Sequence, residues 1–291
     1  MSHTSYTPDD DMVMIGLPPF RYLIPPHDEI HISCIFTWDK SKALYLQSAW
    51  QSITSKPVLV GGPAFGSPAT DFTPGQYVKA GIIFTSRGCN NSCPWCSVPK
   101  LEGKLKELPI IPGNIIQDNN FLQTSQKHQQ AVFDMLKSQR GICFKGGLQA
   151  NLITDWHAEQ FSAIKVKELW LACDTDNHID SLQKALDILK HHGLGVTRPN
   201  KLPNERDVLK AYVLCALEGQ DPITMHHNEQ RLRVVYNMGV MPFAQLYQPL
   251  SDHKIEYSIP WKRFARQWSR PAAIYAHMKR IDPRVYPFQA I

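Results

Sequence analysis

The sequence lacks the features of membrane and secreted proteins. Its 291 residues contain no apolar run near the roughly 20 residues that a membrane-spanning helix needs. Residues 1–11 are polar and acidic, unlike the basic and apolar segments of a signal peptide. We therefore expect a cytoplasmic protein that does not work at a membrane.

The chain also lacks internal repeats and low-complexity tracts, which excludes solenoids and disordered proteins. Its hydrophobic content of 43% suits one sizeable folded domain with a small attachment. The net charge of +5 is a mild basic excess. It permits an anionic partner such as nucleic acid, but many metabolic enzymes are equally basic, so charge alone does not decide the function.

The cysteines do not form a paired framework. There are seven of them, an odd number, and the cytoplasm keeps thiols reduced, so disulfides are not expected. Three cysteines stand within eight residues, and the other four are scattered. This spacing indicates one metal site and several unrelated cysteines.

The N-terminal part reads as an arm followed by a small unit. Residues 1–28 are rich in proline, which favours an extended chain over regular structure. Strand-like runs at 29–37 and 57–61 flank a helical pattern at 40–52, which predicts a βαβ unit. Residues 62–78 are rich in glycine, proline and serine and read as a loop.

The rest of the chain alternates between apolar runs and helical patterns, which predicts a parallel sheet with helices outside it. Gly193 follows one predicted helix, where a left-handed C-cap is expected. The fold class is therefore α/β, and the pattern fits an open sheet or an incomplete barrel. The predicted strands are 81–85, 114–118, 141–145, 168–173, 211–216 and 240–247, and predicted helices include 124–138, 179–192 and 226–237.

The strongest motif is TSRGCNNSCPWCSVPK at residues 85–100, which spaces Cys89, Cys93 and Cys96 as C-x3-C-x2-C on a loop after a strand. Thiolates suit iron–sulfur clusters, zinc or copper(I). A structural zinc site normally has four ligands, and no nearby cysteine or histidine pair supplies a fourth. Three ligands leave an open position, which is what a catalytic metal site needs.

This spacing, with Trp95 just before the third cysteine, resembles the signature of the radical S-adenosylmethionine (radical SAM) superfamily. The resemblance covers roughly residues 80–250 and implies a partial (β/α)6 barrel. It implies that the three cysteines hold a [4Fe–4S] cluster whose fourth iron binds S-adenosylmethionine. An external one-electron donor of the flavodoxin or ferredoxin type then starts cleavage to a 5′-deoxyadenosyl radical, which abstracts hydrogen from a substrate.

The N-terminal unit resembles, in much shortened form, the cobalamin-binding domain of one radical SAM branch. The sequence has no Asp-x-His-x-x-Gly motif, so we do not expect cobalamin. We divide the chain into residues 1–78, an arm and βαβ extension, 79–250, the barrel, and 251–291, a basic and aromatic C-terminal extension.

Cofactor contacts are expected where the strands end, as in barrels generally. Trp95 is expected to cover the cluster or lie near the adenine. Asp118, Asn119 and Asn120 follow the second strand, where many relatives carry a Gly-Gly-Glu motif that binds the amino group of the cofactor. The residues here are more similar to those of the methylthiotransferase-like and cobalamin-linked branches. A plain polar turn is the alternative.

Two further strand ends carry candidates. Gly146 and Gly147 let a backbone approach a ligand closely, and Gln149 is placed to hydrogen-bond the cofactor or substrate. A glycine turn is the alternative there. Asp174 follows the fourth strand and is expected to bind ribose hydroxyls. Its alternative is a helix N-cap nearby, at Asp176 or Asn177.

The four scattered cysteines lie in apolar strand-like runs and are expected to be buried as small hydrophobic side chains. The alternative is that one of them faces the barrel interior and donates a hydrogen atom to a substrate radical. These cysteines are Cys34, Cys143, Cys173 and Cys215.

The C-terminal segment at 261–280 mixes cations with aromatics. The aromatics share one helical face, which usually packs on the domain while the charges lie in water. The alternative is that the cations follow a phosphate backbone and an aromatic stacks on a base. The residues are Lys262, Arg263, Arg266 and Arg270 with Trp261, Phe264 and Trp268, and the loop after the cysteines adds Lys100, Lys104 and Lys106.

These features predict a radical SAM enzyme that rearranges or modifies a nucleobase or nucleotide, in DNA or RNA. The alternatives are a radical SAM enzyme with a small metabolite or peptide as substrate, and a non-catalytic iron–sulfur or zinc protein that binds nucleic acid. No C-x2-C pair remains for a second cluster, which argues against sulfur insertion.

Overall fold

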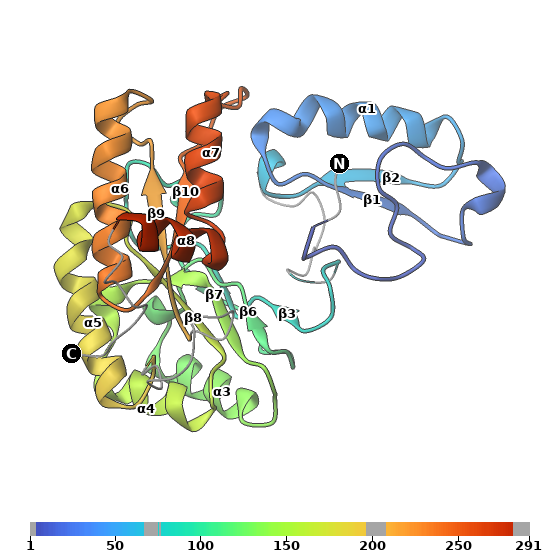
Figure 1. Ribbon diagram of the computed structural model, residues 1–291. Coiled ribbons are helices and arrows are strands. Elements are labelled where there is room, and N and C mark those ends of the chain that lie inside the picture. The colour runs from blue at the N-terminus through green and yellow to red at the C-terminus, as the bar shows by residue number, and fades with distance from the viewer. Residues whose placement is uncertain (1–3, 67–74, 76, 196–207, 282–291) are drawn as a thin grey trace.

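A computed structural model describes residues 4–66, 75, 77–195 and 208–281 (Figure 1). Part of the loop predicted at 62–78 and residues 282–291 of the C-terminal extension lie outside the described residues. The buried apolar side chains form two clusters. One lies between the main sheet and its helices, and the other lies inside the N-terminal unit.

Six parallel strands form the main sheet, and they follow one another in chain order from β3 to β10. Each strand therefore pairs with the next sheet strand along the chain, and parallel neighbours of this kind need crossover connections, which contain helices from β6 onward. This confirms the α/β class and the predicted parallel sheet. The strands are β3 (Ile82–Ile83), β6 (Ile115–Ile116), β7 (Cys143–Leu148), β8 (Glu168–Ala172), β9 (Leu209–Cys215) and β10 (Met241–Leu246).

Helices follow the sheet strands from β6 onward, and α5 and α6 run side by side along the outside of the sheet (Figure 1). Gly193 ends α5 with φ of +78°, as expected for its predicted C-cap. The helix α6 begins four residues earlier than predicted, because Asp221 caps it and Pro222 occupies its first turn. The helices are α3 (Gln126–Leu136), α4 (Asp155–Ala163), α5 (Ile179–His191), α6 (Pro222–Asn237), α7 (Ile259–Gln267) and α8 (Pro271–Ile281).

The two faces of the sheet differ in chemistry. Leu169 and Leu171 on β8 are fully buried in the main core. Between them, Trp170 points to the other face, where its ring stacks on that of Tyr212 at 4.5 Å between centroids. Both rings are half-buried. The sheet thus has a dry, helix-covered face and a second face lined by aromatic and charged side chains.

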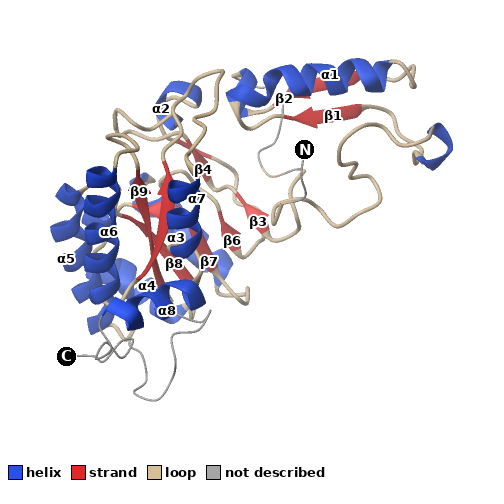
Figure 2. Ribbon diagram, turned by 45° about the horizontal axis from the view of Figure 1, so that its top comes forward, coloured by secondary structure: helices blue, strands red, loops and turns tan. Residues whose placement is uncertain are grey.

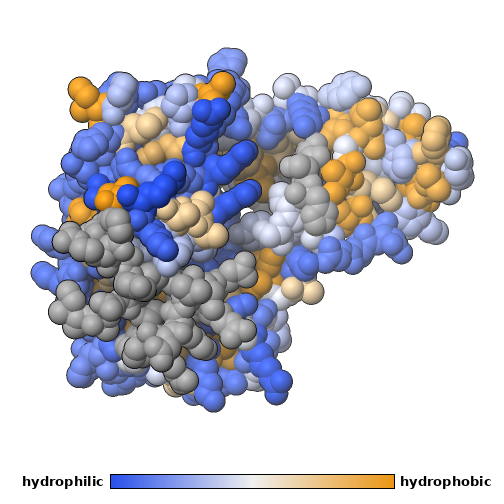
Figure 3. Space-filling model, viewed as in Figure 1, coloured by the Kyte–Doolittle hydropathy of each residue, from blue (hydrophilic) through white to orange (hydrophobic). Residues whose placement is uncertain are grey.

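The N-terminal unit has the predicted βαβ form. Strands β1 (Ile30–Ser33) and β2 (Val58–Gly61) pair in parallel, and α1 (Lys40–Gln51) connects them. Trp50 is buried against both strands' apolar side chains. The outer surface of this unit carries exposed apolar residues, which gather there in Figure 3. Its short 3₁₀ turns are Arg21–Leu23, Thr37–Asp39 and Pro63–Phe65.

The aromatic side chains of the C-terminal extension pack on the main core, as the packing interpretation predicted. Trp261 and Trp268 have no exposed surface, and Phe264 is 7% exposed. None of the three is therefore free to stack on a base. The neighbouring cations, Lys262, Arg263, Arg266 and Arg270, are exposed.

The four scattered cysteines are buried in the apolar clusters or in strands, as the structural interpretation predicted. Cys173 and Cys215 are fully buried in the core on the helix-covered side of the sheet. They do not face the opposite side of the sheet. Among the described residues, no helix is long and apolar enough to cross a membrane.

The third strand corrects the prediction that it ends before the glycines. Strand β7 continues through Gly146 and Gly147 to Leu148, with a register shift against β8 between Phe144 and Leu148. Gly146 presses against the second strand's end, since a Cβ added there would stand 1.7 Å from the Asp118 carbonyl oxygen. Gly146 therefore marks a close crossing of two backbones, whereas Gly147 is a strand residue with a φ of +87° whose added Cβ would meet only the Tyr212 ring, at 3.7 Å.

We expect Gly146→Ala to lower the free energy of unfolding by about 3 kcal/mol, because the added carbon cannot fit without moving the backbone. Urea unfolding measures the loss. Gly61→Ala is the matched control, since a Cβ there meets nothing within 4 Å. Equal stability of the two variants would contradict the crowding at Gly146.

Candidate functional site

The three cysteines lie on a loop at one end of the parallel sheet. The loop leaves β4 (Ser86–Arg87), which follows β3, and returns through α2 (Val98–Leu101) to β5 (Lys106–Glu107). Strands β4 and β5 pair antiparallel and close the base of the loop. Figure 2 shows α2 and β4 beyond this end of the sheet, so the loop stands over the carboxyl ends of the strands.

Gly88 gives the loop its tight start. Its φ is +81°, and a Cβ there would stand 2.3 Å from the Lys104 carbonyl oxygen. Its N–H donates to Asn119 Oδ1 at 3.1 Å and to Glu102 Oε2 at 3.2 Å, and Glu102 also pairs with Arg87. The predicted ligand Asn119 thus holds the loop backbone beside the first cysteine.

Four amide side chains surround Cys89. Gln149 Oε1 accepts from Asn91 Nδ2 at 2.9 Å, Asn120 Nδ2 at 2.7 Å and Gln123 Nε2 at 3.1 Å. Gln123 also accepts from the Asn90 N–H at 2.8 Å through its Oε1 and donates to Asn91 Oδ1. The predicted residues Asn120 and Gln149 therefore meet in one network with the loop.

Trp95 and Asp174 also meet, although 79 positions separate them in the sequence. The Trp95 indole N–H donates to Asp174 Oδ2 at 3.3 Å, and its ring lies edge-on to His178. Burial raises the pKa of the Asp174 carboxyl. The cap of the next helix is Thr175, whose side chain bonds with His178, so neither Asp176 nor Asn177 is the N-cap. Asp174 is therefore free of a capping role and faces the cysteine loop.

Asp118 is buried beneath the loop, with 2% of its surface exposed. Its carboxylate accepts from the Thr85 N–H at 2.6 Å, Thr85 Oγ1 at 2.5 Å and Ser86 Oγ at 2.8 Å. Burial raises the pKa of this carboxyl despite these bonds. Asp118 ties β4 to the end of β6, and its role toward a cofactor amino group stays a prediction.

Sequence reasoning missed three residues of the site. Gln123 lies in the 3₁₀ turn Phe121–Gln123, three residues beyond the predicted polar run. Thr85 is the last residue of the predicted strand 81–85, and Ser86 follows it inside the quoted motif. The signal available for all three was their position near a strand end, where polar side chains need partners. Two further 3₁₀ turns border this region, Ala150–Leu152 and Asp176–His178.

The electrostatics around the cysteines suit a positively charged metal group. Burial raises the pKa of the Cys93 and Cys96 thiols, and the neighbouring thiols and Asp174 raise both pKa values further. Glu102 also raises the pKa of Cys96. No set of three or more His, Cys, Asp or Glu in the described parts of the chain is placed to hold one metal ion. An iron cluster is larger than one ion, and bound metal deprotonates thiols that the protein alone keeps neutral. Three thiolates are the type of donor that iron–sulfur clusters take, so the chemistry of the donor set fits such a cluster.

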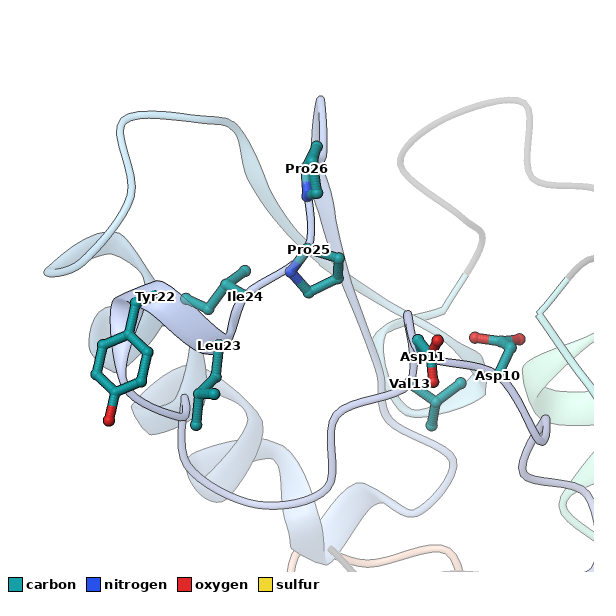
Figure 4. Close-up of a pocket in the computed structure, with 8 residues that line it drawn as sticks. All are labelled: Asp10, Asp11, Val13, Tyr22, Leu23, Ile24, Pro25 and Pro26. Atoms are coloured by element: carbon teal, nitrogen blue, oxygen red, sulfur yellow. The ribbon is translucent and has the colours of Figure 1, made fainter.

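An open hollow of about 630 Å³ lies elsewhere, on the N-terminal arm (Figure 4). It contains none of the cysteines or predicted cofactor ligands, and its polar side chains carry no arrangement typical of catalysis. We do not assign it to the site. Its lining residues are Asp10, Asp11, Val13, Tyr22, Leu23, Ile24, Pro25 and Pro26.

No protein-family model and no curated protein matches this chain. The function is therefore inferred from the residues of the site.

We expect Asp118→Asn to remove a pH dependence of stability. Because burial raises the carboxyl pKa in the folded protein above its ordinary value of 3.8, the folded state holds the proton more tightly than the unfolded chain. The stability of the wild type should rise relative to the variant as pH falls from neutral toward that value. Urea unfolding at a series of pH values measures the difference, and a constant difference would contradict the raised pKa.

Proposed function

We propose that this protein is a radical SAM enzyme with a [4Fe–4S] cluster on Cys89, Cys93 and Cys96. The observation that carries the proposal is the C-x3-C-x2-C loop at the carboxyl end of a parallel sheet, among groups that call for a cation. The sheet supports it, because six parallel strands in chain order are what a partial (β/α)6 barrel requires. Three ligands leave the open position that the cofactor needs.

When bound, the cluster and S-adenosylmethionine supply a hydrogen-abstracting radical after an external donor delivers one electron. The chain's own residues bind and orient these groups. Trp95 and Asp174 form one wall beside the cysteines, with the carboxylate of Asp174 placed for ribose hydroxyls. Asn119, Asn120 and Gln149 lie beside Gly88 and Cys89, and in this proposal they orient the cysteine loop next to the cofactor. Gly146 supports this arrangement by letting β7 cross close to Asp118, and Gly147 continues the strand with a φ of +87°.

The substrate we propose is a nucleobase or nucleotide, in DNA or RNA. Lys100, Lys104 and Lys106 are exposed on the segment that follows the cysteines, and the net charge is +5. These cations are free for phosphate contacts. Stacking by Trp261 or Trp268 is not part of the proposal, since both rings are buried. A small metabolite or a peptide is the other substrate class.

The deciding experiment is anaerobic reconstitution with iron and sulfide, followed by reduction, addition of S-adenosylmethionine and assay of 5′-deoxyadenosine. We expect product from the wild type and only background from the triple change of Cys89, Cys93 and Cys96 to Ala. Cys143→Ala is the matched control, because this buried cysteine lies in β7 rather than on the loop, and it should retain both cluster and product.

Two outcomes would count against the proposal. Bound zinc in place of iron would indicate a structural metal site. A complete four-iron cluster that never cleaves the cofactor, with or without nucleic acid present, would indicate a non-catalytic iron–sulfur protein.

The substrate class has its own test. For a nucleic-acid substrate, the logarithm of the binding constant should fall linearly with the logarithm of salt concentration. Lys104→Ala should reduce that slope by about 0.9 for each phosphate that the lysine neutralises in the wild type. Lys184→Ala, on the exposed side of α5, is the control and should leave the slope unchanged. Binding that does not respond to salt would favour a small metabolite or peptide.

A further inference from the structure

Asn120 occupies a helix N-cap position without acting as a cap. It precedes the 3₁₀ turn Phe121–Gln123, and its side chain makes no capping hydrogen bond. The residue is 4% exposed, and its Oδ1 is buried with no hydrogen-bond partner among the described residues. Asparagine at this position normally stabilises a helix end through a side-chain hydrogen bond. Because Asn120 makes no such bond, its buried amide must serve another interaction.

The amide nitrogen of Asn120 points at Cys89. Asn120 Nδ2 lies 2.7 Å from Gln149 Oε1 and 3.8 Å from Cys89 Sγ. Gln149 Nε2 donates to Asn151 Oδ1 at 2.8 Å, and this bond keeps Gln149 Oε1 turned toward Asn120. The reverse orientation of Asn120 would bring two acceptors, its own oxygen and that of Gln149, together. Both hydrogens of the Asn120 amide thus have a defined direction.

Gln123 contacts the same sulfur in a different way. Its Oε1 lies 3.6 Å from Cys89 Sγ and accepts from the thiol, while it also accepts from the Asn90 N–H. A thiolate has no proton to donate, so this contact ends when Cys89 binds metal. The Asn120 contact becomes stronger instead, because its acceptor then carries negative charge.

We propose that Asn120 tunes the reduction potential of the cluster by donating a hydrogen bond to the Cys89 thiolate. This inference rests on the proposed function. One electron passes from the external donor to the cluster, the donor is oxidised, and Asn120 keeps its proton throughout. The reduced cluster carries one more negative charge, so a hydrogen bond to its sulfur ligand stabilises the reduced form more than the oxidised form. Asn120 is a positioning residue that makes the cluster easier to reduce.

The buried oxygen of Asn120 supports this role. A buried carbonyl without a partner is destabilising, and a leucine of similar shape would remove that cost. Asn120→Leu is therefore expected to fold. It removes the donor to Cys89 and leaves the three cysteines in place.

The experiment is a redox titration of the reconstituted protein, followed by the electron paramagnetic resonance signal of the reduced cluster. We expect Asn120→Leu to bind the same amount of iron but to have a more negative midpoint potential. At a fixed applied potential, its ratio of reduced to oxidised cluster should fall several-fold. Asn228→Leu is the matched control. Asn228 is fully buried in α6, its Oδ1 accepts from the Ala216 N–H, and its midpoint should match the wild type.

An unchanged midpoint in Asn120→Leu would overturn the inference, as would an equal shift in Asn228→Leu. If Asn120→Leu holds no cluster, Asn120→Ser is titrated instead, and its weaker hydroxyl donor should also give a more negative midpoint. Failure of both variants to hold a cluster would assign Asn120 to cluster retention and overturn tuning. A wild type that takes up no four-iron cluster would instead overturn the proposed function itself.

Discussion

The buried carboxylate of Asp118 holds the cysteine loop to the sheet. Its bonds to Thr85 and Ser86 join the start of β4 to the end of β6, so the loop begins from a defined point. The carboxylate reaches that position because β7 crosses close behind it, which only glycine at position 146 allows. The start of the cysteine loop therefore depends on the buried acid Asp118 and on the absence of a side chain at Gly146.

The site combines a base held by Asp118 with polar side chains from the ends of three strands. Asn119, Asn120 and Gln149 come from the ends of β6 and β7, whereas Asp174 comes from the end of β8. Parallel strands in chain order bring these ends to one edge, so residues far apart in the sequence meet beside the cysteines. Neutral amides lie near Cys89, and acidic groups act on Cys93 and Cys96. The two sides of the loop thus offer a bound group different chemistry.

The strand and helix pattern was predictable because each sheet strand is a short apolar run between helical segments. The buried rings of Trp261 and Trp268 were predictable from their shared helical face. The path of β7 through Gly146 and Gly147 was not predictable. A glycine in a sequence indicates conformational freedom, but it does not show which other part of the chain packs against it. Asp118 was expected at the cofactor, and its bonds to Thr85 and Ser86 depend on a tertiary contact across 32 or 33 positions. The local sequence pattern locates the strand ends, but it does not show which polar groups at those ends form hydrogen bonds with one another.

The amides beside Cys89 offer a physical reason for the absence of a Gly-Gly-Glu motif at this strand end. If the loop holds the proposed cluster, a carboxylate beside Cys89 would add negative charge next to a group that accepts an electron, and would make its reduction harder. The carboxylate of Asp118 is buried beneath the loop, where it accepts hydrogen bonds from Thr85 and Ser86. Asn120 instead directs one N–H donor toward the sulfur and the other toward Gln149. The order Asp118-Asn119-Asn120 therefore puts the acid where it supports the loop and the neutral amides where they face the cysteines.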